Sequence, residues 1–383
     1  MGVTLSLRER DGKEILDHMA ATYEGTQRYA DRMKGRVSPG HFRNTQGVMA
    51  SSIGLGTYLG EPDDATDEAY RTAILRAVEL GVNVIDSAIN YRFQRSERSI
   101  GRAIRDLTSS GKAQRDELII ATKAGYLTFD GSIPEDPKHY IQDTLICTGV
   151  IDPCDITAGS HCMTPRYLEN QIQRSLENLG VDSIDIFYIH NPETELSDVD
   201  RDEFIRRLRA AFEYLEGEVQ SGRIRQYGLA TWNGFRVPQS ARDSLSIEAA
   251  FLCAHSLAAD SHHFRYVQLP YNLAMPEAFM RPYQVIDGHP VTILEACRHL
   301  GISVMASASM LQSQLSGGLP AIISDNLPGL RTDAQRAIQF VRSTPGIASG
   351  LVGMSQVAHV EENLEVAAFP PAPAGVSKLF EEA

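Results

Sequence analysis

The chain has 383 residues, and its 36 Lys and Arg against 49 Asp and Glu give a formal net charge of −13. Such a negative surface repels the phosphates of nucleic acids and of anionic membranes, so neither is an expected partner. Residues 1–15 contain no apolar run typical of a signal peptide, and no stretch approaches the roughly 18 apolar residues of a membrane span. We therefore expect a cytoplasmic protein whose length allows two domains or one large α/β barrel.

The cysteines do not indicate a disulfide framework, because the chain has five of them, an odd number, and no expected signal peptide. Three of them, Cys147, Cys154 and Cys162, lie in one segment with Asp155 and His161. Their spacing lacks the close Cys-x-x-Cys pairs of common zinc sites. Loop packing is therefore favoured over a metal site, and we expect no metal.

The two ends of the chain lie outside the expected domain, which covers residues 41–370. Residues 1–40 are rich in charge and predict one helix over residues 11–33. We interpret this segment as an N-terminal extension, and residues 371–383 as a C-terminal tail.

The domain is predicted to begin with a small hairpin at residues 41–51, followed by a first core strand at residues 52–55. Gly54, Gly56 and Gly60 resemble half of a dinucleotide-binding fingerprint, but their spacing is wrong for it. These glycines therefore indicate a tight turn, and a Rossmann fold has little support.

Predicted helices and strands alternate from residue 67 onward. In the helix expected at residues 166–179, Leu168, Ile172 and Leu176 recur at helical spacing and form one apolar stripe. We count eight alternations, which imply parallel pairing and predict an α/β fold, a (β/α)8 TIM barrel, with a doubly wound sheet as the alternative. The predicted helices cover residues 67–80, 96–107, 166–179, 203–220, 247–257, 291–300, 332–342 and 358–367. After the strand at 52–55, the predicted strands are one that begins at Val84 and those at residues 118–122, 184–189, 227–231, 266–269, 303–307 and 348–353.

Three consecutive predicted strands end at an ionisable residue, namely Asp86, Lys123 and His190, and Tyr91 follows Asp86 on an expected loop. The carboxyl ends of the strands hold the chemistry in TIM barrels, so we expect these four side chains to meet at one rim. Taken singly, each has a structural explanation: a rim ion pair for Asp86 and Lys123, a packed phenol for Tyr91 and a satisfied imidazole for His190. Their coincidence favours a catalytic site.

The four residues suit the reduction of a carbonyl group. Tyr91 is the expected proton donor, and the ammonium of Lys123 is expected to lower the pKa of its phenol. Asp86 would hold Lys123, and His190 would hydrogen-bond the carbonyl oxygen. The set contains no obvious nucleophile for acyl transfer and no metal ligands, so the hydride must come from a bound cofactor.

A long insertion, from about residue 125 to residue 163, separates the Lys123 strand from the next helix. Because it follows the carboxyl end of a strand, we expect it to lie over the rim as a lid or substrate wall, with Tyr126, Phe129 and Tyr140 as linings. A surface decoration or an oligomer contact is the alternative. Trp232, the only tryptophan, fits either the pocket or the core.

The chain resembles the aldo-keto reductase superfamily over roughly residues 45–368. The resemblance implies a (β/α)8 barrel, a nicotinamide cofactor that is usually NADP(H), and Asp86, Tyr91, Lys123 and His190 as the catalytic tetrad. The matching segments occur in order and are Ile53-Gly-Leu-Gly-Thr57, Asn83-Val-Ile-Asp86 with Tyr91, Ser96-Glu97, Ala121-Thr-Lys123, Ser175-Leu-x-x-Leu-Gly180, Asp185-Ile-Phe-Tyr-Ile-His190, Gly222-Arg-Ile-Arg-x-x-Gly228, Gln268-Leu-Pro-Tyr-Asn272 and Glu361-Glu-Asn363.

The resemblance also implies cofactor contacts, among them Gln268 at the nicotinamide carboxamide. Some positions depart from the family pattern: Thr231 stands where Ser-Asn is common, Ser307 where an aromatic ring stacks, and Gln356 and His359 where a basic pair holds the 2′-phosphate. We therefore expect NADP(H), with NAD(H) as the open alternative. The expected cofactor-binding residues are Gly56, Thr57, Tyr58, Asp86, Thr231, Gln268, Ser307, Ser355, Gln356, His359, Glu362 and Asn363.

The predicted function is that of an NAD(P)H-dependent oxidoreductase that interconverts a carbonyl and an alcohol, with Tyr91 as general acid and base. A sugar, a polyketide-like ketone and an aromatic aldehyde would all fit as substrates. The alternative is a cofactor-sensing regulatory subunit with little turnover, like those attached to potassium channels. The oligomeric state is open.

Overall fold

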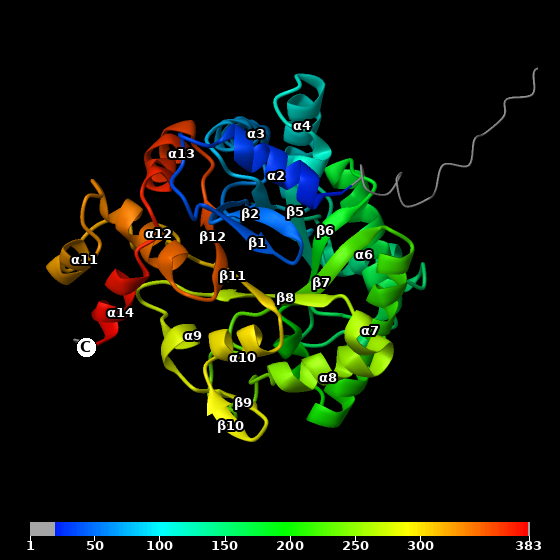
Figure 1. Ribbon diagram of the computed structural model, residues 1–383. Helices are drawn as coiled ribbons and strands as arrows, with labels where there is room; N and C mark the ends of the chain where they lie inside the picture. The colour runs from blue at the N-terminus through cyan, green and yellow to red at the C-terminus, as the bar shows by residue number, and fades with distance from the viewer. Residues whose placement is uncertain (1–19, 382–383) are drawn as a thin grey trace, which may run out of the picture.

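The computed structural model describes residues 20–381, and its centre is a closed barrel of eight parallel strands (Figure 1). Parallel pairing of the last strand with the first closes the ring, with Gly350 opposite Ile53. The predicted (β/α)8 barrel is confirmed, and the doubly wound alternative is wrong. The strands, in their order around the barrel, are β3 (Ile53–Gly56), β4 (Val84–Asp86), β5 (Ile119–Ala124), β6 (Ile184–His190), β7 (Ile224–Ala230), β8 (Phe264–Pro270), β11 (Ser303–Ser307) and β12 (Ile347–Gly353).

Helices that pack against the outside of the barrel follow the strands (Figure 1). The residue before the first turn determines where three of these helices begin. The side chains of Asp63, Asp200 and Thr332 each accept a hydrogen bond from the backbone of the first turn. Gly180, with φ 64°, ends one of them in the left-handed conformation. The eight helices are α3 (Asp64–Glu79), α4 (Arg95–Ser109), α6 (Pro165–Leu179), α7 (Arg201–Gln220), α8 (Ile247–Ala258), α10 (Ile293–His299), α12 (Asp333–Ser343) and α13 (Val357–Leu364).

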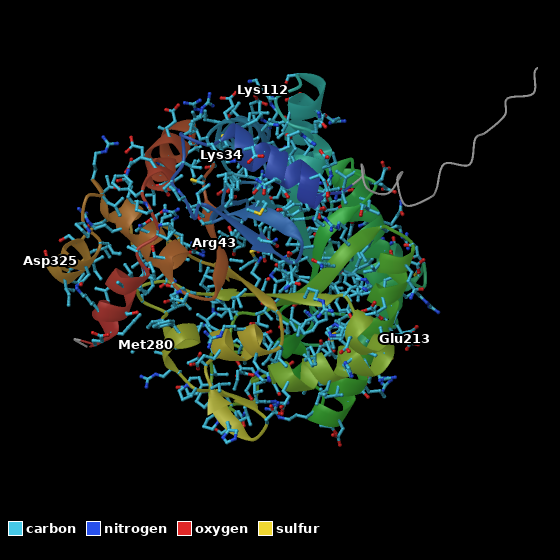
Figure 2. All side chains as sticks on the ribbon, viewed as in Figure 1. Lys34, Arg43, Lys112, Glu213, Met280 and Asp325 are labelled. Atoms are coloured by element: carbon cyan, nitrogen blue, oxygen red, sulfur yellow. The ribbon has the colours of Figure 1, made fainter. Side chains whose placement is uncertain are left out.

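Alternation along the strands produces two apolar cores. Ile85, Ile120 and Phe187 face outward and join the large core between strands and helices, whereas their neighbours face into the barrel. The inner core contains Val48, Ala50, Val84, Ile119, Ala121, Ile186, Tyr188, Ala230, Tyr266, Met305 and Leu351. The side chains in Figure 2 fill this interior and project outward from the surface helices. The inner core therefore packs inside the barrel, beneath the carboxyl ends of the strands.

The amino-terminal end of the barrel is closed by a hairpin, β1 (Phe42–Thr45) and β2 (Val48–Ser51), which lies across the ring in Figure 1. The hairpin predicted at residues 41–51 is confirmed. The side-chain amide of Asn83 donates to Met49 O (2.8 Å) and its oxygen accepts from Ser51 N (2.8 Å), which ties the hairpin to the start of β4.

The helix predicted at residues 11–33 is shorter in the part that the structure describes. Helix α2 covers Tyr23–Arg32, and residues 20–22 are not helical. The helix begins after Thr22, because the side chain of this residue accepts a hydrogen bond from Gly25 N and caps the helix. Residues 11–19 lie outside the described residues.

Several short elements were not predicted. The predicted start of the helix at Val291 is wrong, because Val291 belongs to a strand of a hairpin. The helix begins at Ile293, after a capping box formed by Thr292 and Glu295. Near the C-terminus, Val376 and Leu379 are buried on a further helix. Outside the insertion, the unpredicted α-helices and strands are α9 (Glu277–Met280), β9 (Gln284–Ile286), β10 (His289–Val291), α11 (Ala321–Asn326) and α14 (Pro373–Glu381).

The insertion after β5 contains helix α5 (Pro137–Ile141) and a π-helical turn (Gln142–Ile146). Its residues Leu145, Ile151 and Cys162 form a small core together with Tyr167 on α6. Because β5 ends at Ala124, the insertion starts at the carboxyl end of the barrel. None of the helices between residues 20 and 381 has the length and apolarity that a membrane crossing requires.

Candidate active site

A buried ion pair lies at the carboxyl ends of two adjacent strands. Lys123 Nζ on β5 donates to Asp86 Oδ2 on β4 (2.7 Å) and to Ser87 O (2.6 Å). Asp86 is 5% exposed and Lys123 is fully buried. A lysine in such a position needs a carboxylate partner, because burying an unpaired charge is costly. Parallel strand pairing therefore brings together the two residues that sequence analysis had placed at consecutive strand ends.

Asp86 has two further neighbours among the expected cofactor-binding residues. Gln268 on β8 donates from Nε2 to Asp86 Oδ1 (2.7 Å), across the mouth of the barrel. The hydroxyl of Thr57, just after β3, donates to Asp86 O (3.1 Å). Both Thr57 and Gln268 are buried, so Asp86 is held from three sides.

Tyr91 stands beside this pair, within a cluster of rings. Lys123 Nζ lies 4.9 Å from the centre of the Tyr91 ring, a cation–π arrangement. The Tyr91 ring makes edge-to-face contacts with the rings of Tyr58 and His190, whose centroids lie 4.9 and 5.8 Å from its own. Tyr126 completes the cluster, 5.3 Å from His190. All four residues of the expected tetrad thus lie in one group.

The surroundings of Tyr91 raise the pKa of its phenol well above the ordinary value, chiefly through burial and then through the negative charge of Asp86. The expectation that Lys123 lowers this pKa is wrong. The ammonium faces Asp86 and Ser87 O, so its charge is neutralised locally, and burial lowers the pKa of Lys123 itself. Tyr91 is therefore held in its protonated form.

Burial lowers the pKa of His190 well below the usual value, and the positive charges of Lys123 and His161 act in the same direction. The imidazole is therefore neutral over the physiological range. Its Nδ1 is buried and has no hydrogen-bond partner among the described residues. Such an arrangement leaves a neutral imidazole free to bond a ligand.

The turn after Tyr91 is strained, which sequence analysis missed. Arg92, Phe93 and Gln94 have φ values of 46°, 54° and 73°, and non-glycine residues in this region cost about 1–3 kcal/mol each. The charge of buried Arg92 is compensated, because its guanidinium donates a hydrogen bond to Asp67 (2.5 Å). This tight turn presents Tyr91 to the mouth of the barrel.

The insertion lies against the same turn. Gly131 N donates to Phe93 O (2.9 Å), and Gln94 Nε2 donates to Phe129 O (2.9 Å). Of the expected linings, Tyr126 contacts His190, whereas Phe129 packs on Phe93 and on Tyr140. The insertion thus adjoins the catalytic group through Tyr126.

Some of the positions expected to contact a cofactor lie at the carboxyl ends of β3 and β12 and on helix α13. The pairing of β12 with β3 puts Gly353 opposite Gly56, which itself lies opposite Asp86. Ser355, Gln356 and His359 follow β12 at the start of α13, where Gln356 and His359 are exposed. Glu362 is half-buried and Asn363 buried farther along this helix.

The other expected contacts come from β7, β11 and the loop after β3. Buried Thr231 follows β7, and its hydroxyl has no partner among residues 20–381. Ser307, the last residue of β11, is half-buried, and its carbonyl accepts from Tyr271 N (3.1 Å). Tyr58 and Trp232 are 55% and 45% exposed, which leaves both rings available at the rim rather than in the core.

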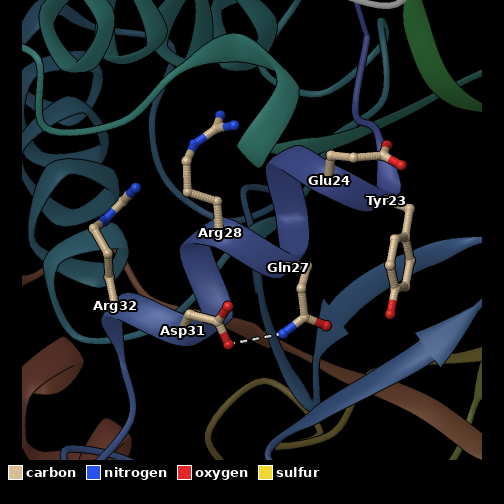
Figure 3. A pocket seen from close by; sticks show the side chains of 6 residues that line it. All are labelled: Tyr23, Glu24, Gln27, Arg28, Asp31 and Arg32. Carbon is tan, nitrogen blue, oxygen red and sulfur yellow. Dashed lines mark hydrogen bonds between the residues drawn. The ribbon is translucent and has the colours of Figure 1, made fainter.

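A surface hollow of about 660 Å³ lies elsewhere, along α2 (Figure 3). Tyr23, Glu24, Gln27, Arg28, Asp31 and Arg32 line it. Helix α2 packs near Asp116 and Glu117, just before the start of β5, so the hollow belongs to the amino-terminal end of the barrel. It is therefore separate from the group around Asp86.

Within the described part of the chain, no group of three His, Cys, Asp or Glu side chains is arranged to hold a metal ion. Cys147 and Cys154 are exposed, while Cys162 is buried in the small core of the insertion. The three cysteines of the insertion thus do not converge.

The model of the aldo/keto reductase family matches residues 52–319. Because this match covers more than half of the chain, the chain belongs to the aldo/keto reductases, a family of oxidoreductases. The aldo-keto reductase YhdN of Bacillus subtilis is 25% identical over 193 residues, which are 50% of this chain and 47% of that protein. The chain thus spans about half the length of this relative.

Two other comparisons extend over most of the chain. A putative voltage-gated potassium channel subunit beta of Schizosaccharomyces pombe is 23% identical over 359 residues, 86% of this chain and 88% of that protein. The crystal structure of an aldo/keto reductase from Klebsiella pneumoniae, in complex with NADP and acetate, has a TM-score of 0.60 at 20% identity and covers 90% of this chain and 95% of that one. The two structures share a fold.

Proposed function

We propose that the protein is an NADPH-dependent reductase of aldehydes or ketones, which also oxidises the corresponding alcohols. The observation that carries the proposal is the group formed by the buried Asp86–Lys123 pair, the adjacent Tyr91 ring and neutral His190 at the mouth of the barrel. It combines a proton donor with a hydrogen-bonding imidazole and lacks a nucleophile poised for acyl transfer.

The residues beside this group fit a nicotinamide dinucleotide. The unpartnered hydroxyl of buried Thr231 is a polar atom that a ligand can satisfy. Gln356 caps α13 without a side-chain hydrogen bond, so the backbone N–H groups of the first turn are free of a side-chain cap and suit a phosphate. When bound, the nicotinamide supplies the hydride.

This chain's own residues then handle the proton and the carbonyl oxygen. Tyr91 donates its phenolic proton to the oxygen of the substrate as the carbonyl is reduced. Lys123, held by Asp86, lies against the face of the ring and keeps the phenol in place at the mouth of the barrel. Neutral His190 donates a hydrogen bond to the same oxygen and orients the carbonyl.

The rim favours an uncharged, aromatic or apolar carbonyl compound over a phosphorylated one. Tyr58, Tyr126 and Trp232 offer ring faces there. Two nearby guanidiniums are already engaged: Arg92 bonds Asp67 (2.5 Å) and Arg236 bonds Glu277 (3.0 Å). They are therefore not available to bind a phosphate.

We do not favour the regulatory alternative, although one relative is a putative potassium channel subunit. A buried ion pair is costly to maintain, and here it supports a phenol and an imidazole that a purely binding role does not need.

The proposal is tested by titrating the purified protein with NADPH and with NADH, followed by a panel of aromatic, aliphatic and phosphorylated carbonyl compounds. We expect binding of both nucleotides, tighter for NADPH, and turnover of the aromatic compounds. The missing basic pair at Gln356 and His359 makes the preference for NADPH modest. A protein that binds neither nucleotide would disprove the proposal, and binding without any turnover would favour the regulatory alternative.

The reduction rate should be nearly independent of pH between about pH 6.5 and about pH 9. A depressed pKa keeps His190 neutral as the pH falls through the usual range of histidine, and a raised pKa keeps Tyr91 protonated as the pH rises. Both limbs of the kcat/KM profile therefore lie outside this window. A bell-shaped profile with a maximum near neutral pH would contradict these assignments.

A further inference from the structure

His161, in the insertion, contacts the backbone of the strand that carries His190. Its Nε2 lies 2.8 Å from His190 O, and the imidazole is completely buried. A carbonyl oxygen can only accept, so Nε2 carries the hydrogen and donates. This bond crosses from the insertion to the last residue of β6, directly behind the imidazole of His190.

The opposite side of the His161 ring faces a carboxylate. Nδ1 lies 2.7 Å from Oε1 of fully buried Glu195, whose Oε2 accepts from Arg207 on α7 (2.6 Å). The guanidinium of Arg207 thus forms an ion pair with Glu195 on the side of the carboxylate that faces away from His161. Both neighbours of the ring offer acceptor atoms, and the positive charge of the protonated ring acts to lower the pKa of His190.

The contact depends on close approach at Gly125. A Cβ at this position would lie 2.5 Å from His190 O and 2.6 Å from His161 Nε2, so any side chain would separate the two groups. The insertion is pinned at the same place, since Cys162 N donates to Gly125 O (2.8 Å). Tyr126 packs its ring against both histidines, with centroids 5.3 Å from each.

We propose that His161, with Glu195 and Arg207 behind it, is a positioning residue for His190: it fixes the strand end that carries the catalytic imidazole and places a buried positive charge beside it. The inference rests on the proposed function. The charge opposes protonation of His190, and the hydrogen bond holds its backbone. The insertion thereby becomes part of the active site.

Other titratable groups face this unit from the surrounding elements. Lys123 on β5 adds a second positive charge near His190, while Tyr126 and Cys162 come from the insertion itself. Arg207 is also bonded to Glu203 (2.7 Å). A substitution at His161 leaves Glu195 paired with Arg207, so it removes one positive charge and leaves the rest of the network intact.

Two variants separate the hydrogen bond from the charge. His161→Gln keeps an Nε2 donor that can reach His190 O but removes the charge, and His161→Met removes both. The matched control is His139→Gln, because His139 lies in the same insertion, is 71% exposed and pairs only with Asp143 among the described residues (3.1 Å). NADPH affinity, kcat and KM for the best aldehyde of the panel are measured against pH for each.

In His161→Met we expect kcat/KM at neutral pH to fall about tenfold, which corresponds to about 1.4 kcal/mol, with NADPH affinity unchanged. His161→Gln should recover most of this loss. In both variants the acid limb of the profile should move to higher pH, because His190 takes up a proton more readily once the neighbouring charge is gone. His139→Gln should do neither. An acid limb that stays in place in both variants overturns the inference.

Two other outcomes must be told apart from failure of the inference: a variant that does not fold, and a wild type without reductase activity. If His161→Met does not fold, as judged by circular dichroism, the acid limb of His161→Gln decides. If the wild type reduces no carbonyl, the proposed function fails, and the ring titration of His190 is measured by NMR with 15N-labelled histidine, assigned through His190→Gln. A titration that moves to higher pH in His161→Gln then supports the inference, and an unchanged one overturns it.

Discussion

Tyr91→Phe should bind NADPH as tightly as the wild type and lose carbonyl reduction by about 10²–10⁴-fold, the usual contribution of a general acid. The substitution removes only the hydroxyl, so the ring keeps its contacts with Lys123, Tyr58 and His190. The loss should fall on kcat, because the proton is transferred only as the reaction proceeds. Steady-state kinetics at saturating NADPH and a separate nucleotide titration measure the two effects.

The matched control for this experiment is Tyr58→Phe. Tyr58 meets the Tyr91 ring edge-on but is 55% exposed, so its hydroxyl has no assigned role in proton transfer. We expect a small change in KM and an almost unchanged kcat. If Tyr91→Phe retained more than about a tenth of the activity, another group would have to be the acid.

Lys123→Met should abolish turnover and also lower the free energy of unfolding by about 3–5 kcal/mol, because it leaves Asp86 buried without its cation. Asp86 would keep only the hydrogen bond from Gln268 to its side chain (2.7 Å). Urea unfolding followed by circular dichroism measures the stability, and the aldehyde assay measures the activity.

Two further variants identify the cause of this loss. Lys112→Met removes an exposed lysine, labelled in Figure 2, that pairs with Glu79 (2.6 Å), and it should cost at most about 1 kcal/mol. The double variant Asp86→Asn with Lys123→Met removes the unpaired charge, so it should regain stability without regaining activity. If Lys123→Met were as stable as Lys112→Met, the ion pair would not be buried as described.

The barrel and the identity of its central group could be predicted from the sequence because both depend on local patterns. Apolar strands that carry Asp86, Lys123 and His190 at or next to their last residue alternate with amphipathic helices, and parallel strands of a barrel bring such ends to one rim. The short elements that were missed, such as the β9–β10 hairpin, have no long periodic pattern. The predicted helix start at Val291 was wrong for this reason, since a capping residue one position later decided it.

The sequence by itself thus determined the architecture and the residues that meet at its mouth, whereas the tertiary structure decided how these residues behave. The pKa of Tyr91 is raised rather than lowered, because burial and the opposing charge of Asp86 depend on everything packed around the ring. Similarly, His161 comes from an irregular insertion, Glu195 from a short 3-10 helix and Arg207 from helix α7. No periodic signal links such segments, and only their packing in space brings the three side chains behind His190.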